Sequence, residues 1–238
     1  MRSVLVLFDS ESDEYIYNDI LEYLEPNFNV SFETLSVHSD LDKVVNRLKK
    51  NDFDFALVGA GHGIALPSIC ATCTDRPVFG VPVPNFFGGL DAFLSIVQTP
   101  LEVPVGAVSP KSMASFTSFL GEVASKNSRV INIVLSQDVE SHEYAIQEYS
   151  RLEEYALHLG LEVKKSNSID ESLMNIVLVH SDHNLEVANN ALYVPLLTNS
   201  EKNSPAHSIR ILNTIDHGGI WFGINNPRNA LKFLSKFL

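Results

Sequence analysis

Short apolar runs alternate with helical patterns along the first 125 residues, and this alternation constrains the fold more than any other feature. Val4–Phe8 is a continuous apolar run and Phe53–Val58 is apolar apart from Asp54, as is typical of strands buried on both faces. Between them, apolar residues recur at helical spacing within 40–50. The same patterns predict further strands over 30–35 and 77–83 and further helices over 16–24, 90–97 and 111–124. This alternation favours right-handed crossovers and a parallel sheet, so we expect a three-layer α/β/α fold with a flavodoxin-like sheet.

The pattern restarts after a polar linker at 125–129. Val130–Leu135 is predicted to be a new buried strand, and 140–159 is predicted to be helical. Later segments parallel earlier ones in order and spacing, namely Asn175–Val179 with Phe55–Ala60, Val194–Leu196 with Val81–Val83, Ile209–Thr214 with Leu94–Thr99 and Phe222–Gly223 with Val105–Gly106. We interpret this as an internal duplication, 1–125 and 129–238, whose second copy kept its core and lost its loops. The alternative is that any two α/β halves share buried strands of this kind.

Composition limits the classes of partner. The chain has 238 residues, of which 45% are hydrophobic, so it can bury one large core or two smaller ones. Its formal net charge of -12 argues against nucleic acid or an anionic membrane as a partner. No apolar run reaches the roughly 18 residues of a membrane span, and the first run meets Asp9 too early for a signal peptide. We therefore expect a cytoplasmic protein.

Polar or glycine-rich loops follow three of the predicted strands, at 9–13, 36–40 and 59–63. In parallel sheets, ligands bind outside the carboxyl ends of the strands. Glycines such as those in Val58–Pro67 let the backbone approach a ligand closely, although one such loop is weak support by itself. Three loops in a fixed order predict a binding site.

These loops carry motifs of a known family. Residues 9–13 read Asp-Ser-Glu-Ser-Asp where the family has Gly-Ser-x-Ser-Asp, and 36–38 read Ser-Val-His where it has Ser-Ala-His. Residues 59–62 read Gly-Ala-Gly-His where it has Gly-Ala-Gly-Gly. Its Gly-Val-Pro-Val strand is intact at 80–83, and its Gly-x-Asp-x-Leu-x-Ser-x-Val-Gln-x-Pro motif is nearly intact over 89–100.

Residues 3–122 thus resemble the PurE family, the 5-(carboxyamino)imidazole ribonucleotide mutases and aminoimidazole ribonucleotide carboxylases of purine biosynthesis. The resemblance implies that a carboxylate leaves the exocyclic nitrogen of the ribonucleotide and rejoins a ring carbon, without metal or organic cofactor. It implies that His38 shuttles the proton, a task that suits imidazole. The substrate contacts that it implies are Gly59, Ala60 and Gly61 at the carboxylate, Ser10 and Ser36 at the phosphate, Asp13 at the ribose, and Ser12, Ser39, His62 and Leu66 elsewhere.

Departures from the family pattern leave the activity open. Ser39 stands where the family has a phosphate-binding arginine, and a hydrogen bond to a charged group is worth roughly 1.5 to 3 kcal/mol. Lys43 and Arg47 are candidates to replace that arginine. His62 and Asp9 each occupy a glycine position. We expect a mutase or carboxylase; the alternative is a non-catalytic or re-purposed PurE-like protein with a degraded phosphate site.

Other polar features are interpreted as structural. Cys70 and Cys73 form a CxxC pattern inside a predicted helix, and two cysteines cannot close a zinc site, so we expect core thiols. Residues 180–183, His-Ser-Asp-His, are expected to form a polar loop rather than a metal site. Residues 216–219 are expected to form a turn before the last strand.

The resemblance also implies an assembly. The family typically forms octamers with active sites where subunits meet, so two halves per chain would build a pseudo-octamer from four chains. The second half lacks counterparts of 36–38 and 59–61, since 167–169 and 180–182 read Asn-Ser-Ile and His-Ser-Asp. We therefore expect it to support the site of the first half rather than to form its own.

Overall fold

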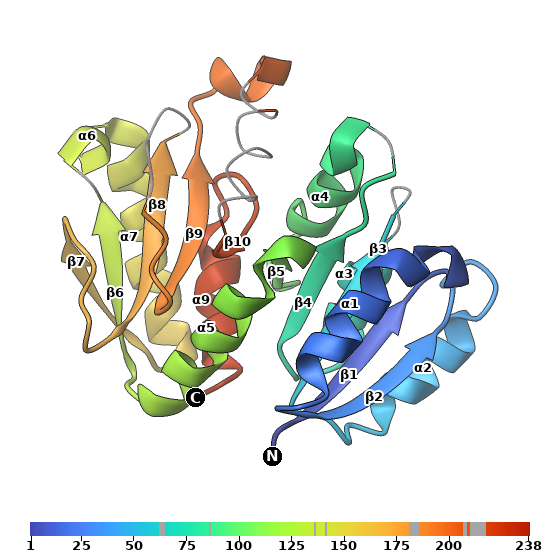
Figure 1. Cartoon of the computed structure of the whole chain (residues 1–238). Helices are drawn as coiled ribbons and strands as arrows, with labels where there is room; N and C mark the ends of the chain where they lie inside the picture. The colour runs from blue at the N-terminus through green and yellow to red at the C-terminus, as the bar shows by residue number, and fades with distance from the viewer. Residues whose placement is uncertain are drawn as a thin grey trace.

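The computed structural model describes residues 1–61, 65–85, 87–135, 137–140, 142–180, 186–206, 209 and 218–238. Its strands form one sheet in the order β2-β1-β3-β4-β5-β10-β9-β8-β6-β7, with helices on both faces (Figure 1). This is the α/β fold that the alternation predicted. Within the described ranges, no helix combines the length and the apolar character needed to cross a membrane.

The N-terminal half, residues 1–125, contributes five strands and their crossover helices. The strands are β1 (Ser3–Phe8), β2 (Asn29–Thr34), β3 (Phe55–Ala60), β4 (Val78–Pro82) and β5 (Val105–Val108). The helices are η1 (Glu11–Asp13), α1 (Glu14–Leu24), α2 (Leu41–Lys49), α3 (Leu66–Cys73), η2 (Phe87–Gly89), α4 (Leu90–Val97), η3 (Pro110–Ser112) and α5 (Met113–Ser125). The predicted helix over 90–97 is confirmed to the residue, and the other predicted boundaries agree within a few residues.

The C-terminal half, residues 129–238, repeats this alternation. Its strands are β6 (Val130–Leu135), β7 (Glu162–Ser166), β8 (Met174–His180), β9 (Ala191–Leu196) and β10 (Ile220–Trp221). Its helices are α6 (Gln137–Glu140), α7 (Glu143–Leu159), η4 (Glu201–Asn203) and α9 (Pro227–Ser235). The periodicity did not reveal β7, because Glu-Val-Lys-Lys-Ser is a polar edge strand, and charged side chains protect such edges. The parallel drawn for 209–214 lies, after Ile209, outside the described residues.

The halves join edge to edge. Each half is parallel internally, as predicted, but β10 pairs with β5 antiparallel, with Ile220 opposite Val108 and Trp221 opposite Ala107. The hydrophobic periodicity of the sequence predicts strands but does not predict which strands pair between the halves. Gly106 is required there, because a Cβ at this position would lie 2.7 Å from Cγ2 of Ile220.

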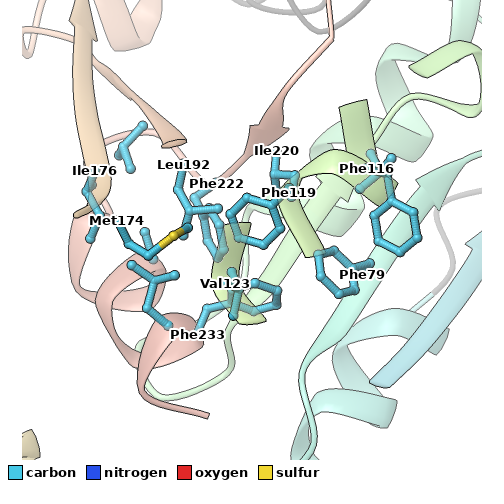
Figure 2. Packing of buried hydrophobic residues seen from close by; sticks show 14 of the residues in the cluster. Phe79, Phe116, Phe119, Val123, Met174, Ile176, Leu192, Ile220, Phe222 and Phe233 are labelled. Carbon is cyan, nitrogen blue, oxygen red and sulfur yellow. The ribbon is translucent and has the colours of Figure 1, made fainter. Parts of the chain in front are cut away.

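A single aromatic core crosses the boundary between the halves. Phe79 of β4 packs edge to face against Phe116 of α5 and Phe233 of α9, with ring centroids 4.8 and 4.9 Å apart. Figure 2 shows this row of rings continuing toward Met174 and Leu192 of the C-terminal half. Each such ring pair contributes about 0.5 to 1.5 kcal/mol beyond burial of its area. The two halves therefore depend on each other for their cores.

A buried amide reinforces the same junction. Asn229 of α9 is buried, and its Nδ2 donates to Oγ1 of Thr99 at 3.1 Å and to the carbonyl of Pro100 at 2.8 Å. Its Oδ1 accepts from the backbone N–H of Glu102 at 3.0 Å. One side chain of the C-terminal half thus forms hydrogen bonds with three residues of the loop that precedes β5.

Candidate active site

The three predicted site loops lie at one edge of the sheet. β1 lies between β2 and β3, and Phe8, its last residue, pairs with Thr34 on one side and Gly59 on the other. The N–H of Leu35 donates to the carbonyl of Phe8 at 2.9 Å, which holds the start of the second loop against β1. Since neighbouring strands are about 4.8 Å apart, the ends of β2 and β3 are on the order of 10 Å apart. The sheet therefore brings the loops at 9–13, 36–40 and 59–61 together (Figure 1).

His38 is exposed in the loop after β2. The loop is a tight turn, in which the N–H of Asp40 donates to the carbonyl of Ser36 at 2.8 Å. The N–H of His38 donates to Oγ of Ser36 at 3.3 Å. The imidazole is thus presented to solvent at the carboxyl edge and is not packed into the core.

The loop after β1 presents two hydroxyl groups. Oγ of Ser10 accepts from the N–H of Ser12 at 3.2 Å and lies 2.8 Å from Oγ of Ser12. The hydrogen bond that caps this segment comes from Ser10, because the short helix η1 precedes α1. Asp13 is only 4% exposed, at the start of α1.

Gly59, inside β3, and Gly61, directly after it, are required for different physical reasons. A Cβ on Gly59 would lie 2.1 Å from the ring of Phe8, so this glycine is required by core packing. A Cβ on Gly61 would lie 2.3 Å from Nδ2 of Asn85, so a side-chain amide closely approaches the backbone there. Ala60 is buried, and its carbonyl accepts from the N–H of Val83 at 3.0 Å, which holds the end of β4 beside that of β3.

Asn85 was missed by the sequence reasoning. It is exposed, next to Gly61, and it makes no hydrogen bond to a described residue. Its amide can therefore donate to a ligand held over the loop after β3. The signal that could have found it is an amide residue three positions after the glycine-containing strand β4, at the sheet edge where ligands bind.

The candidate replacements for the missing arginine are both engaged. Arg47 is buried, and its guanidinium donates to Glu33 at 2.5 Å, Asp52 at 2.7 Å and Ser31 at 3.1 Å. Burial lowers the pKa of Arg47, but the hydrogen bonds to Asp52 and Glu33 outweigh it and raise the pKa overall. The hypothesis that Arg47 binds phosphate is therefore wrong.

Lys43 remains at the loop after β2. Its Nζ lies 2.6 Å from Oδ1 of Asp40. The hydrogen bonds from Lys43 and Ser39 lower the pKa of Asp40, so that carboxylate is charged at neutral pH. Ser39 itself is exposed, and its Oγ donates to Asp40 at 3.1 Å.

Two carboxylates near these loops are incompletely satisfied. Oδ1 of Asp9, directly after β1, and Oδ1 of Asp91, in the first turn of α4, are buried without a hydrogen-bond partner among the described residues. Buried polar atoms normally have partners, so these oxygens are available to hydrogen-bond donors of a ligand.

Of the two remaining residues predicted to contact the substrate, one lies in the core and the other lies outside the described residues. Leu66 begins α3 with its side chain fully buried among core residues. His62 lies outside the described residues.

The cysteines and the other polar loops were expected to be structural. Cys70 is buried and free, and burial raises the pKa of its thiol far above the usual range; Cys73 is half-buried and also free. His180 pairs with Glu201, Oε1 lying 3.0 Å from Nε2, whereas 181–183 and 216–217 lie outside the described residues. Over the described ranges, no three His, Cys, Asp or Glu side chains are placed to hold a metal ion.

Comparison with known proteins covers the part of the chain that contains these loops. The model of the family AIRC, AIR carboxylase, matches residues 3–133. The N5-carboxyaminoimidazole ribonucleotide mutase of Saccharolobus solfataricus is 34% identical over 115 residues, 46% of this chain and 72% of that protein. The mutase of Haemophilus influenzae is 34% identical over 119 residues, 47% of this chain and 73% of that protein. The bifunctional purine synthesis protein purC/E of Dictyostelium discoideum is 40% identical over 86 residues, 34% of this chain and 9% of that protein. The family match spans more than half of the chain, and over the same region the two mutases share a third of their residues with it, so this chain belongs to the AIR carboxylase family.

Proposed function

We propose that this protein acts in purine biosynthesis as a 5-(carboxyamino)imidazole ribonucleotide mutase. The observation that carries the proposal is the exposed His38 at the same sheet edge as Gly61, where the chain leaves β3. The names of the related mutases give the reaction class. Such a role places the protein in the cytoplasm.

His38 moves one proton in the proposed reaction. As the bond between the exocyclic nitrogen and the carboxyl group breaks, carbon dioxide leaves and His38 gives a proton to the nitrogen. Carbon dioxide then bonds to the ring carbon, and His38 takes the proton that this carbon loses. The proton count returns to its starting value, so no external acid or base is consumed.

The surrounding residues hold the two ends of the substrate. The backbone at 59–61 and the amide of Asn85 hold the carboxyl fragment, because hydrogen bonds to a charged acceptor are the strong ones. Ser10, Ser36 and Ser39 bind the phosphate, with Lys43 supplying positive charge at that loop. Asp13 and Ser12 contact the ribose. The remaining contacts are His62 and the backbone of Leu66.

The C-terminal half, residues 129–238, is proposed to be a degenerate second copy of the family domain that residues 1–125 form. The strand order supports this: counted within each half, both halves run second, first, third, fourth, fifth. Four chains would then form a pseudo-octamer. Light scattering of the purified protein is expected to give the mass of four chains, and a monomer would contradict the assembly.

A turnover assay with the two carboxylated aminoimidazole ribonucleotides tests the activity. We expect interconversion without ATP or metal, and His38→Asn should lower turnover by about 10²-fold or more while thermal unfolding is unchanged. His158→Asn, an exposed histidine on α7, is the matched control. A folded protein without turnover would instead support the re-purposed relative. That alternative is favoured by one observation, the sequestration of Arg47 away from the phosphate loop.

A further inference from the structure

The C-terminal half has a polar pocket of its own, with a cavity volume of about 520 Å³. One wall is the first half of α7, with Tyr144, Glu148 and Arg151. The opposite wall is the chain that follows β9 and β10, with Thr198, Lys202 and Asn225. The pocket therefore lies at the carboxyl ends of these strands, where α/β sheets bind ligands. Its volume falls within the range of small-molecule sites.

Glu148 is the least expected residue of this pocket. It is 6% exposed and shares the inner face of α7 with Ala145, Leu152 and Ala156. Its Oε1 lies 2.5 Å from Nη1 of Arg151, but its Oε2 is buried without a hydrogen-bond partner among the described residues. Burying a charged oxygen in this state is costly, and core packing does not explain it. A donor from a bound ligand would satisfy it.

Tyr144 adds a second unsatisfied polar atom. Its hydroxyl is buried and has no partner in the described part of the chain. Burial, with a smaller contribution from Glu201, raises the pKa of Tyr144, so the hydroxyl keeps its proton at neutral pH. The pocket wall thus offers a carboxylate acceptor and a hydroxyl from successive turns of one helix.

The opposite wall is held in place by its own hydrogen bonds. Asn225 adopts a φ of 54°, and its side chain accepts from the N–H of Leu197 at 2.7 Å and donates to the carbonyl of Leu197 at 2.8 Å. Oε2 of Glu201 accepts from the N–H and the hydroxyl of Thr198 at 2.7 and 2.8 Å. Such supporting contacts are typical of a wall that is formed before a ligand binds.

Charge indicates the class of ligand. The charged side chains that line the pocket are Glu143, Glu148, Arg151 and Lys202, two of each sign. Lys202 is exposed and makes no ion pair with a described residue, and the guanidinium of Arg151 has donors beyond the one that meets Glu148. A ligand with no net charge but with both an ammonium and a carboxylate matches this lining better than a phosphate dianion.

We propose that this pocket binds a free amino acid. Its ammonium donates to Oε2 of Glu148, and its carboxylate accepts from Arg151 and Lys202. The pocket would give the C-terminal half a binding site separate from the loops around His38, and the proposal does not depend on the mutase activity.

Calorimetry on the full chain tests this with a panel of the common amino acids, inorganic phosphate and ribose 5-phosphate. We expect at least one amino acid to bind and neither phosphate compound to do so at this pocket. Glu148→Gln should weaken binding of the amino acid by about tenfold or more, because it removes a charge-assisted hydrogen bond. Glu154→Gln, exposed on the same helix, should leave the affinity unchanged.

Lys202→Ala provides a second variant that does not touch the buried carboxylate. This substitution should weaken binding of the same amino acid while the unfolding temperature stays constant. The proposal is overturned if no amino acid binds, if a phosphate compound competes for the pocket more tightly, or if both Glu148→Gln and Lys202→Ala bind like the unmodified protein.

Discussion

The two halves share a strand order but differ in what they place at their strand ends. In the N-terminal half, the ends of β1, β2 and β3 bear serines, glycines and an exposed histidine, so backbone and small side chains form the surface. In the C-terminal half, the corresponding edge has a pocket walled by Glu148, Arg151 and Asn225. The comparison teaches that buried strands maintain a fold while the loops after them determine its chemistry.

The largest expected effect follows from separating the halves. A protein ending at residue 128 would expose Phe79, whose ring packs against Phe116 and Phe119 of its own half and against Phe233 of α9. We expect it to aggregate or to lack a cooperative unfolding transition, as measured by circular dichroism during thermal unfolding. A well-folded, soluble N-terminal half would show that the halves are independent.

A smaller effect is expected from the amide at the junction. Asn229→Ala removes a buried amide, leaves the part-buried N–H of Glu102 without its acceptor, and takes one of two donors from the carbonyl of Pro100, which keeps the N–H of Val103. We expect the free energy of unfolding to fall by about 3 kcal/mol, measured by urea titration. Asn203→Ala, at an exposed amide, should change it by less than about 0.5 kcal/mol. Equal losses in both variants would mean that Asn229 does not hold the halves together.

Asn85 tests whether the N-terminal edge is the reactive one. Asn85→Ala removes the amide next to Gly61, so kcat/KM in the mutase assay should fall by about tenfold with no change in unfolding temperature. Asn18→Ala, exposed on α1, is the control. Unchanged kinetics in Asn85→Ala would remove this residue from the carboxylate site.

The smallest effect is a pH dependence of the contact between Lys236 and the N-terminal half. Nζ of Lys236 donates to the carbonyls of Thr74 and Arg76 at 3.1 and 3.3 Å, and burial lowers its pKa to about 8. Between this pKa and the ordinary 10.5, the unfolded chain binds a proton that the folded chain does not, so stability should rise with pH. Urea midpoints across this window should rise less in Lys236→Met than in Lys50→Met, an exposed control. Identical slopes would contradict the lowered pKa.

Much of the site could be placed from the sequence, because each loop directly follows a strand with a clear apolar pattern. His38 and Gly61 reach one edge once β1, β2 and β3 are recognised as neighbours in a parallel sheet. The role of Arg47 could not be predicted, because its partners Glu33 and Asp52 come from other segments. The approach of Asn85 to Gly61 was hidden for the same reason.

The sequence by itself determined the α/β alternation, the positions of nearly all strands and helices, and the resemblance of the first half to its family. These depend on periodicity and short motifs, which are local along the chain. Only the tertiary structure decided that the halves meet through the antiparallel pair of β5 and β10 and share one aromatic core. It alone also formed the pocket around Glu148, because that pocket depends on side chains that are distant in sequence and meet only after the sheet and α7 have packed.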